Sequence, residues 1–174
     1  TSIRSVMLTK PEPLGIEQTK LFSGVIQEAK TISLGFKTPG QIMRILVKVG
    51  DAVRQGQLIA TLDDKDYKLG VEALEIQYKQ LSNEVARMKK LFEGKSISGN
   101  DYEKAVAGLE QVRVQLQTNQ NKLDYTRLYA PVSGYVQSVN FEVAEMVDAG
   151  RAIIDLLDVK QLEVEVDLPS NLYV

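Results

Sequence analysis

The chain reads GQIMRILVKVGDAVRQG from Gly40 to Gly56, and a second stretch, GYVQSVNFEVAEMVDAG from Gly134 to Gly150, follows the same pattern. The glycines at both ends align at one offset of 94 residues, because 134 − 40 and 150 − 56 are both 94. Apolar residues coincide at that offset: Ile42 with Val136, Ile45 with Val139, Val47 with Phe141, Val49 with Val143 and Val53 with Val147. The two stretches are therefore an internal repeat.

Each half alternates apolar and polar residues as a half-buried strand does, with glycine where a tight turn needs positive φ. Neither half can bury its apolar face alone, so we expect the two to fold against each other as one flattened β-sandwich. The segment Val47-Lys48-Val49-Gly50-Asp51-Ala52-Val53, followed by Gly56, resembles the biotinyl/lipoyl carrier fold. In that fold a tight turn carrying a modifiable lysine joins the halves.

Residues 64–128 stand where that turn would be, and they have a helical period. One apolar seam with alternating steps of four and three comprises Tyr67, Val71, Leu74, Tyr78, Leu81, Val85, Met88 and Phe92. After a polar break at 93–99, a second seam comprises Tyr102, Ala105, Leu109, Val112, Leu116, Asn119, Leu123 and Thr126. Two such heptad seams predict a long antiparallel coiled-coil α-hairpin with arms of roughly 40 Å.

The ends of the two arms carry capping signals. Asp63 or Asp64 can cap the first helix, and Asn100 with Glu103 forms a capping-box-like pair for the second. Pro131 is expected to end the second arm. A projecting arm of this length implies a partner at a distance.

Composition excludes several functions. The 174 residues carry a net charge of −2 and contain neither cysteine nor histidine. The charge disfavours nucleic-acid binding, and the missing residue types remove thiol chemistry, disulfides and the commonest acid–base group. We therefore expect no enzymatic activity, and no stretch is long and apolar enough to span a bilayer.

Two clusters invite a cofactor or metal interpretation. Asp63, Asp64 and Asp66 resemble calcium ligands, but Leu69 stands where an EF-hand loop needs glycine, so helix capping is the better interpretation. Lys65 lies near the position of a carrier lysine, yet it begins a helix and lacks the usual flanking residues, so we interpret it as solvated. We expect neither a cofactor nor a metal.

Three features together carry a family resemblance: the split halves, the heptad hairpin, and the link LDYTRLYAPVSG from Leu123 to Gly134. The chain resembles the periplasmic adaptors, or membrane fusion proteins, of Gram-negative tripartite efflux pumps, closest to those serving resistance-nodulation-division (RND) transporters. The resemblance implies an α+β fold, in which a split lipoyl/biotinyl-like β-sandwich is interrupted by the hairpin and followed by strands of a truncated β-barrel domain.

The resemblance also implies a contact site for the outer-membrane channel at the hairpin tip. Such adaptors carry an Arg, a Leu four residues on and a Ser seven beyond that, and here Arg87, Leu91 and Ser98 match that spacing. Arg87 and Leu91 lie off the seam and should face outward. Two local alternatives stay open: Leu91 packs against its own turn with Phe92, and Ser98 makes a local turn hydrogen bond.

Leu69 and Ile76 also lie off the seam, seven residues apart, which suggests an apolar stripe for lateral packing between hairpins. Scattered surface apolar residues are the open alternative.

The resemblance divides the chain into five segments. These are 1–28 (N-terminal strands of a β-barrel or membrane-proximal module), 29–63 (first lipoyl half), 64–128 (α-helical hairpin), 129–158 (second lipoyl half) and 159–174 (start of the β-barrel domain). The strand-like stretches are 3–8, 15–27 and 161–169.

The function implied is a periplasmic adaptor that links an inner-membrane efflux transporter to an outer-membrane channel of the TolC type and so exports small molecules, including drugs. It would self-associate into a hexameric ring, and a segment outside this chain would anchor it to the inner membrane. Two alternatives remain: an adaptor of an ATP-driven exporter or type I secretion system, and a biotin or lipoate carrier domain.

Overall fold

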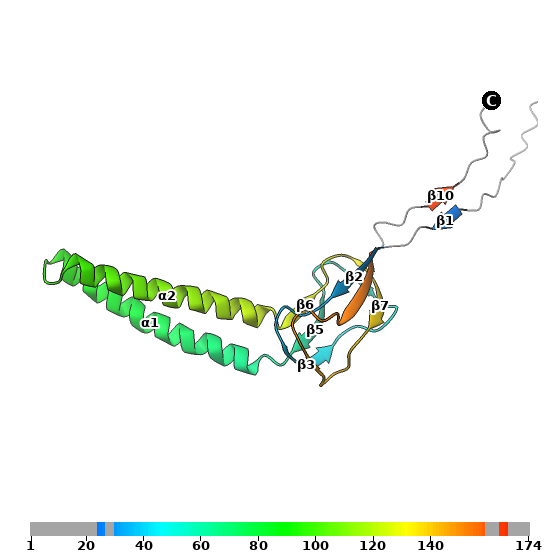
Figure 1. The fold of residues 1–174 in the computed structure, drawn as a ribbon, viewed down its shortest axis with the longest axis horizontal. Helices are drawn as coiled ribbons and strands as arrows, with labels where there is room; N and C mark the ends of the chain where they lie inside the picture. Colours follow the sequence, from blue (N-terminus) through cyan, green and yellow to red (C-terminus); the bar gives the residue numbers. More distant parts are fainter. Residues whose placement is uncertain (1–23, 27–29, 159–163, 167–174) are drawn as a thin grey trace, which may run out of the picture. The chain divides into compact units, whose positions relative to one another are not determined.

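The computed structural model describes residues 24–26, 30–158 and 164–166, in two units. In the smaller unit, strand β1 (Gly24–Ile26) pairs antiparallel with β10 (Val164–Val166), so a segment from each end of the chain meets in one ladder (Figure 1). The other strand-like stretches expected within 1–28 and 159–174 lie outside the described residues.

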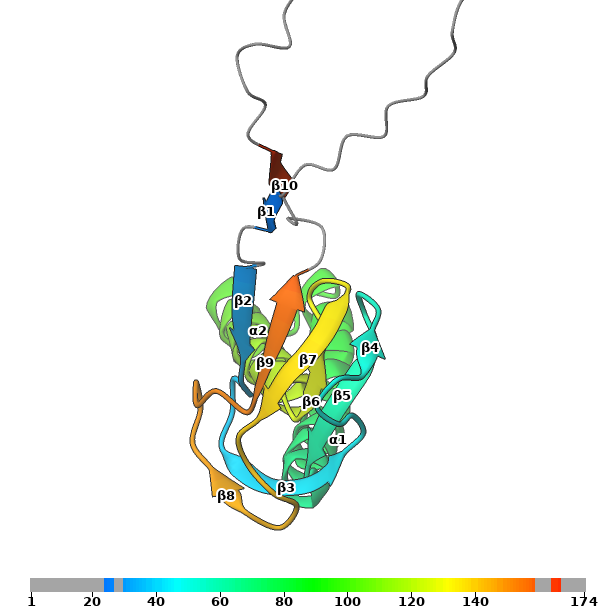
Figure 2. The same cartoon turned by 90° about the vertical axis from the view of Figure 1, so that its right-hand side faces the viewer.

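The larger unit contains two four-stranded antiparallel sheets. The first sheet has the order β2-β9-β7-β4 and the second β6-β5-β3-β8 (Figure 2). Their strands are β2 (Lys30–Leu34), β3 (Gly40–Ile45), β4 (Ala52–Val53), β5 (Leu58–Leu62), β6 (Arg127–Tyr129), β7 (Gly134–Val139), β8 (Met146–Val147) and β9 (Ile154–Asp158). Each sheet takes strands from both halves of the repeat, so the halves interlock.

The sequence repeat is also a structural repeat. The offset of 94 residues carries the bounds of β3 onto those of β7 and the bounds of β4 onto those of β8. Individual hydrogen bonds repeat as well: the Gly50 N–H donates to the Val136 carbonyl at 2.8 Å, and the Ala144 N–H donates to the Ile42 carbonyl at 2.8 Å. Since 144 − 50 and 136 − 42 are both 94, the two sheets are related by an internal pseudo-symmetry.

One hydrophobic core lies between the sheets and follows the same symmetry. Pairs of buried residues at the 94-residue offset are Leu34/Leu128, Phe36/Ala130, Ile42/Val136, Val53/Val147, Ile59/Ile153, Ala60/Ile154 and Leu62/Leu156. Ile59 and Ile153 are completely inaccessible to solvent. Burying side chains of this size stabilises by about 1.5–3 kcal/mol each, and each half contributes one member of every pair.

The repeat glycines serve two purposes. Gly50, Gly56 and Gly150 have φ values of +90°, +82° and +82°, as expected for turns. Gly134 was expected to serve the same purpose but begins β7, where a Cβ would lie 2.1 Å from the Leu157 carbonyl oxygen. Close backbone approach explains glycine there. The counterpart of Gly50 is Ala144, which adopts φ +75° without being glycine.

Two long helices, α1 (Lys65–Glu93) and α2 (Gly99–Asp124), occupy the interval between β5 and β6. They lie side by side and antiparallel, because Phe92 stacks on Tyr102 at one end and Gly70 lies near Asn119 at the other (Figure 1). At 1.5 Å per residue they are about 43 and 39 Å long. Val71 and Val112, both predicted seam residues, are the buried residues of the two helices.

The helix boundaries correct three sequence expectations. The N-cap of α2 is Ser98, so Asn100 lies inside the first turn and does not cap it with Glu103. The helix ends at Asp124, well before Pro131, because the chain enters β6 first. Thr126, placed in the second seam, lies beyond the helix end.

Candidate functional site at the end of the helix pair

The helix pair is fixed to the sheets at its root, where α1 begins and α2 ends. The Tyr67 hydroxyl donates to the Pro39 carbonyl at 2.6 Å, and the Thr38 hydroxyl lies 2.8 Å from the Tyr67 oxygen. Because a phenol has one proton, Thr38 is the donor in the second bond. On the other arm, the Thr126 hydroxyl donates to the Leu123 carbonyl at 2.6 Å.

The far end, which we call the tip (residues 87–98), closes in a tight turn. The Gly94 N–H donates to the Lys90 carbonyl at 3.0 Å, and the Ser96 N–H donates to the Leu91 carbonyl at 2.7 Å. Lys95 reverses the chain with φ +59°, a left-handed conformation that glycine usually takes. The carbonyls of Lys90, Leu91 and Phe92 are thus satisfied within the turn.

Ser98 starts α2 as its N-cap. Its Oγ accepts the Asp101 N–H at 3.2 Å and donates to the Asp101 carboxylate at 2.7 Å. Asp101 also places a negative charge in the first turn, where the helix dipole favours it. Next to this cap the rings of Phe92 and Tyr102 stack with centroids 5.2 Å apart and planes 6° apart, which ties the two arms together.

Arg87 and Leu91 share a face of α1, because residues four apart are neighbours on a helix surface. The Leu91 side chain is 47% exposed, and Arg87 is exposed without a hydrogen bond or ion pair to any other described residue. Ser98 follows on the other side of the turn and makes its hydrogen bonds to Asp101, not to Arg87 or Leu91. The three residues are therefore all at the tip, but no bond joins Ser98 to the other two.

A second group of exposed apolar residues lies along the helices. Leu69 is 61% exposed and Ile76 is 64% exposed, and their spacing of seven places them in one stripe on α1. On α2, Val114 is 52% exposed. These side chains have not been buried by folding of the single chain, so they are available to a neighbour.

Charge at the tip is mostly positive. Residues 87–98 contain four cations, Arg87, Lys89, Lys90 and Lys95, and one acid, Glu93. Farther down α2, a two-fold hydrogen bond joins Arg113 to Glu110, at 2.6 and 2.8 Å. This hydrogen bond lowers the pKa of Glu110 and raises that of Arg113, but both side chains are exposed, so the pair contributes little to stability.

The described residues contain no cluster of three acidic, histidine or cysteine side chains able to hold a metal ion. Asp63 instead accepts the Lys65 N–H at 3.1 Å, and Asp64 pairs with Lys68 at 2.9 Å. Lys65 itself is the first residue of α1 rather than the tip of a tight turn. Within the same described part, neither helix is long and apolar enough to cross a membrane.

Sequence reasoning missed two tip features. A local hydrogen bond of Ser98 was one of the stated alternatives and is present, but its capping role was not predicted, although Ser98-x-x-Asp101 is a readable capping signal, because Gly99 was assigned to the break. The stacking of Phe92 on Tyr102 was not predicted, because both residues were assigned to the buried seams. Phe92 is in fact 42% exposed and contacts Tyr102 at the surface of the tip.

Comparison with known proteins adds a family match. A family model described as the barrel-sandwich hybrid domain of RND MFP matches residues 30–158, which include both sheets and both helices. Curated relatives include the multidrug resistance protein MdtA of Xenorhabdus bovienii, 27% identical over 164 residues, which cover 85% of this chain and 40% of the relative. The macrolide export protein MacA of Escherichia coli O157:H7 is 22% identical over 173 residues, with coverage of 83% and 47%.

Solved structures give the same picture. A Bacteroides eggerthii protein, provisionally described as an efflux transporter, superimposes with a TM-score of 0.80 at 29% identity, covering 86% of this chain and 46% of that one. A MacA–MexA chimera that contains the α-hairpin domain of Pseudomonas aeruginosa MexA gives a TM-score of 0.71 at 25% identity, with coverage of 78% and 48%. The chain thus spans less than half the length of each of these proteins.

Proposed function

Because the chain belongs to the RND membrane fusion proteins through its barrel-sandwich hybrid domain, we propose that it is a periplasmic adaptor of an efflux pump. In this proposal it links an inner-membrane transporter to an outer-membrane channel of the TolC type, for export of small molecules including drugs. It does no chemistry of its own. Relatives named for multidrug resistance and macrolide export support this function.

The observation that carries the proposal is the helix pair itself. Two helices of about 40 Å leave a sandwich whose core is already complete without them. They end in a hydrogen-bonded, capped tip that exposes Leu91 and an excess of positive charge. An element that adds nothing to the core, yet ends in an ordered apolar and charged surface, suits a contact with a distant partner.

At that tip we assign the channel contact to Arg87, Leu91 and Ser98. Leu91 supplies the apolar centre, and Arg87, free of any partner among the described residues, is available to a carboxylate on the channel. Ser98 keeps the first turn of α2 in place through its cap and presents its hydroxyl beside the contact.

Between the root and the tip, we propose that α1 and α2 pack as a coiled coil and that their outer surface mediates lateral assembly. The predicted seams account for Val71 and Val112, which are buried. Leu69 and Ile76, in contrast, form an exposed apolar stripe. We assign this stripe to packing between neighbouring hairpins in a hexameric ring. Burying both in a ring would stabilise it by up to about 3–6 kcal/mol per interface before entropy is subtracted.

The domain organisation proposed is a lipoyl-like sandwich from 29–63 and 129–158, a hairpin from 64–128, and β-barrel or membrane-proximal segments at 1–28 and 159–174. The pairing of β1 with β10 supports bringing the last two segments together. An inner-membrane anchor would lie outside this chain.

The proposal is tested by drug resistance in cells that carry the full-length protein with tip substitutions. Leu91→Asp should abolish resistance at normal expression and with an unchanged melting temperature. Val143→Asp is the matched control, since Val143 is 55% exposed on the sandwich, and it should keep resistance.

Ser98 needs a variant that separates capping from contact. Ser98→Thr keeps the N-cap oxygen and should keep both resistance and stability. Ser98→Arg should lose resistance and also about 1 kcal/mol of stability through the lost cap.

Full resistance in cells that carry Leu91→Asp at normal expression would contradict a role of the tip in export.

A further inference from the structure

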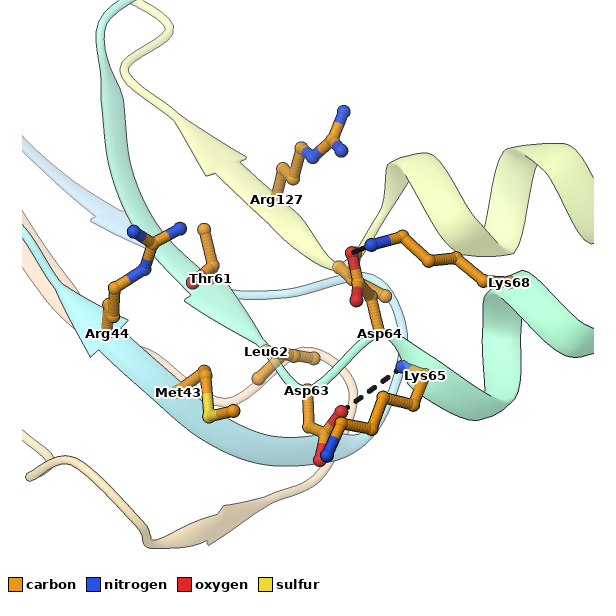
Figure 3. A pocket seen from close by; sticks show the side chains of 10 residues that line it. Met43, Arg44, Thr61, Leu62, Asp63, Asp64, Lys65, Lys68 and Arg127 are labelled. Carbon is orange, nitrogen blue, oxygen red and sulfur yellow. Dashed lines mark hydrogen bonds and ion pairs between the residues drawn. The ribbon is translucent and has the colours of Figure 1, made fainter.

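A row of three side chains crosses the second sheet near the root of the helix pair. Arg44 on β3 lies directly opposite Thr61 on β5, and Thr61 lies directly opposite Arg127 on β6. Figure 3 shows the two arginines on either side of Thr61. Two strand spacings of about 4.8 Å separate the arginine backbones, so both guanidinium groups can reach one point above Thr61.

The arginines line a cavity of about 250 Å³ whose lining has more positive than negative side chains. Its charged residues are the cations Arg44, Lys65, Lys68 and Arg127 and the acids Asp63 and Asp64. Asp64 pairs with Lys68 at 2.9 Å and Asp63 accepts the Lys65 N–H at 3.1 Å, so neither acid is bonded to an arginine (Figure 3). Neither arginine side chain has a hydrogen bond or ion pair within the described residues.

The other sheet has an equivalent row of three side chains, in which the central residue carries a carboxylate. At the 94-residue offset, Arg44, Thr61 and Arg127 correspond to Ser138, Asp155 and Ser33. There the Asp155 carboxylate accepts the Ser33 hydroxyl at 2.6 Å and the Ser138 hydroxyl at 2.7 Å.

In the first sheet, therefore, donors on both sides hold a central carboxylate. Those hydrogen bonds, with a third from Asn140, lower the pKa of Asp155 and keep it charged. In the second sheet, the guanidinium groups of Arg44 and Arg127 are stronger donors on both sides, but the central residue, Thr61, has a hydroxyl in place of a carboxylate. Two like charges that flank one strand without a counter-charge between them repel each other.

We propose that Arg44, Thr61 and Arg127 bind an oxyanion, a phosphate or carboxylate group, at the place above Thr61 that corresponds to the carboxylate of Asp155. Each guanidinium offers a planar fork of N–H donors suited to two oxygens of such a group, and the Thr61 hydroxyl supplies one more donor. This site is separate from the tip and does not depend on the adaptor function.

Inorganic phosphate is the first probe, titrated into the 174-residue chain at constant ionic strength with chloride as the compensating ion. Phosphate should raise the melting temperature of the unsubstituted chain and give saturable shifts in the amide resonances of residues 44, 61 and 127. Arg44→Gln and Arg127→Gln should each weaken binding at least tenfold. Arg54→Gln is the control for loss of one positive charge outside the cavity and should leave binding unchanged.

Thr61→Asp tests the argument from symmetry, because it places a carboxylate where the repeat has Asp155. This variant should melt higher than the unsubstituted chain without phosphate and should no longer respond to phosphate. Thr61→Asn, of the same shape but neutral, should gain no such stability. The proposal would be overturned if phosphate raised the melting temperature equally in the unsubstituted chain, Arg44→Gln and Arg127→Gln. A complete lack of phosphate binding would also overturn it.

The oxyanion could be a free ligand or a carboxylate on a second copy of the chain, and sedimentation velocity distinguishes these sources. A chain that stays monomeric while it binds phosphate has a site for a free ligand. Self-association that phosphate reverses, and that Arg44→Gln abolishes, assigns the oxyanion to a second copy. If neither phosphate binding nor self-association depends on the two arginines, the proposal fails.

Discussion

Exchanging the residues at positions 50 and 144 should change stability in opposite directions, because the two positions are equivalent and only one of them is glycine. Ala144 has φ +75°, and its counterpart Gly50 has φ +90°. A left-handed conformation costs a non-glycine residue about 1–2 kcal/mol, whereas the extra freedom of glycine in the unfolded chain costs about 0.4–1 kcal/mol. Ala144→Gly should therefore stabilise the chain by about 0.5–1 kcal/mol.

Few other contributions to the free energy of unfolding should change in these two variants. Ala144 is exposed, and the hydrogen bond from Gln41 Nε2 goes to its backbone carbonyl, which glycine retains. A Cβ added at Gly50 meets no atom within 4 Å, so Gly50→Ala introduces backbone strain alone. It should destabilise by a similar amount, and the double variant should lie close to the starting chain.

The assay is thermal and urea unfolding of the four proteins. A change of 1 kcal/mol shifts the melting temperature of a domain of 150–250 residues by about 2–4 °C, so shifts of about 1–4 °C in opposite directions are expected. A lower melting temperature for Ala144→Gly would show that the 94-residue symmetry does not extend to backbone energetics.

Three further predictions concern the helix pair and the first sheet. Val112→Asp should cost about 3 kcal/mol or more by burying an unpaired charge, whereas Val114→Asp, two residues on and 52% exposed, should cost less than about 0.5 kcal/mol; urea unfolding that gives equal losses would contradict the seam assignment. Tyr67→Phe removes both root hydrogen bonds and should cost about 1–2 kcal/mol, with faster hydrogen exchange at the start of α1; unchanged exchange there would show that the root bonds do not hold the helix. Because the pKa of Asp155 is lowered in the folded chain, its contribution to stability is present above the unfolded pKa of about 3.9 and is lost as the pH falls through the folded value. Asp155→Asn should flatten the pH dependence of the melting temperature below about pH 4, and an unaltered profile would rule out this linkage.

The sequence predicted the elements whose signal is local. Alternation and glycine spacing predicted β3 and β7, and heptad spacing predicted α1 and α2, because each pattern lies within one continuous segment. The short strands β2 and β6 have no turn glycine and too few residues to show a period. Residues 30–34 were included in the first expected half without being recognised as a strand, whereas residues 127 and 128 of β6 were assigned to the helical hairpin.

Features that depend on pairing between distant segments could not be predicted in detail. A repeat suggests two packed hairpins, whereas the structure exchanges strands between the halves, so that β3 pairs with β8 and β4 with β7. The row of Arg44, Thr61 and Arg127 depends on irregular register steps in β3 and β5, which sequence alternation does not reveal. The tip residues could be located from spacing, and the Ser98-x-x-Asp101 capping pattern was present in the sequence but was overlooked because Gly99 was assigned to the break.

Photo-cross-linking from position 91 is the most direct test of the central claim, that the end of the helix pair contacts an outer-membrane channel. A photoreactive amino acid replaces Leu91 in the full-length protein in cells, and the same replacement at Val143 is the exposed control. We expect a cross-link from position 91 to a channel protein of the outer membrane and none from position 143. A well-expressed protein that forms no channel cross-link from position 91, or forms one equally from position 143, would contradict it.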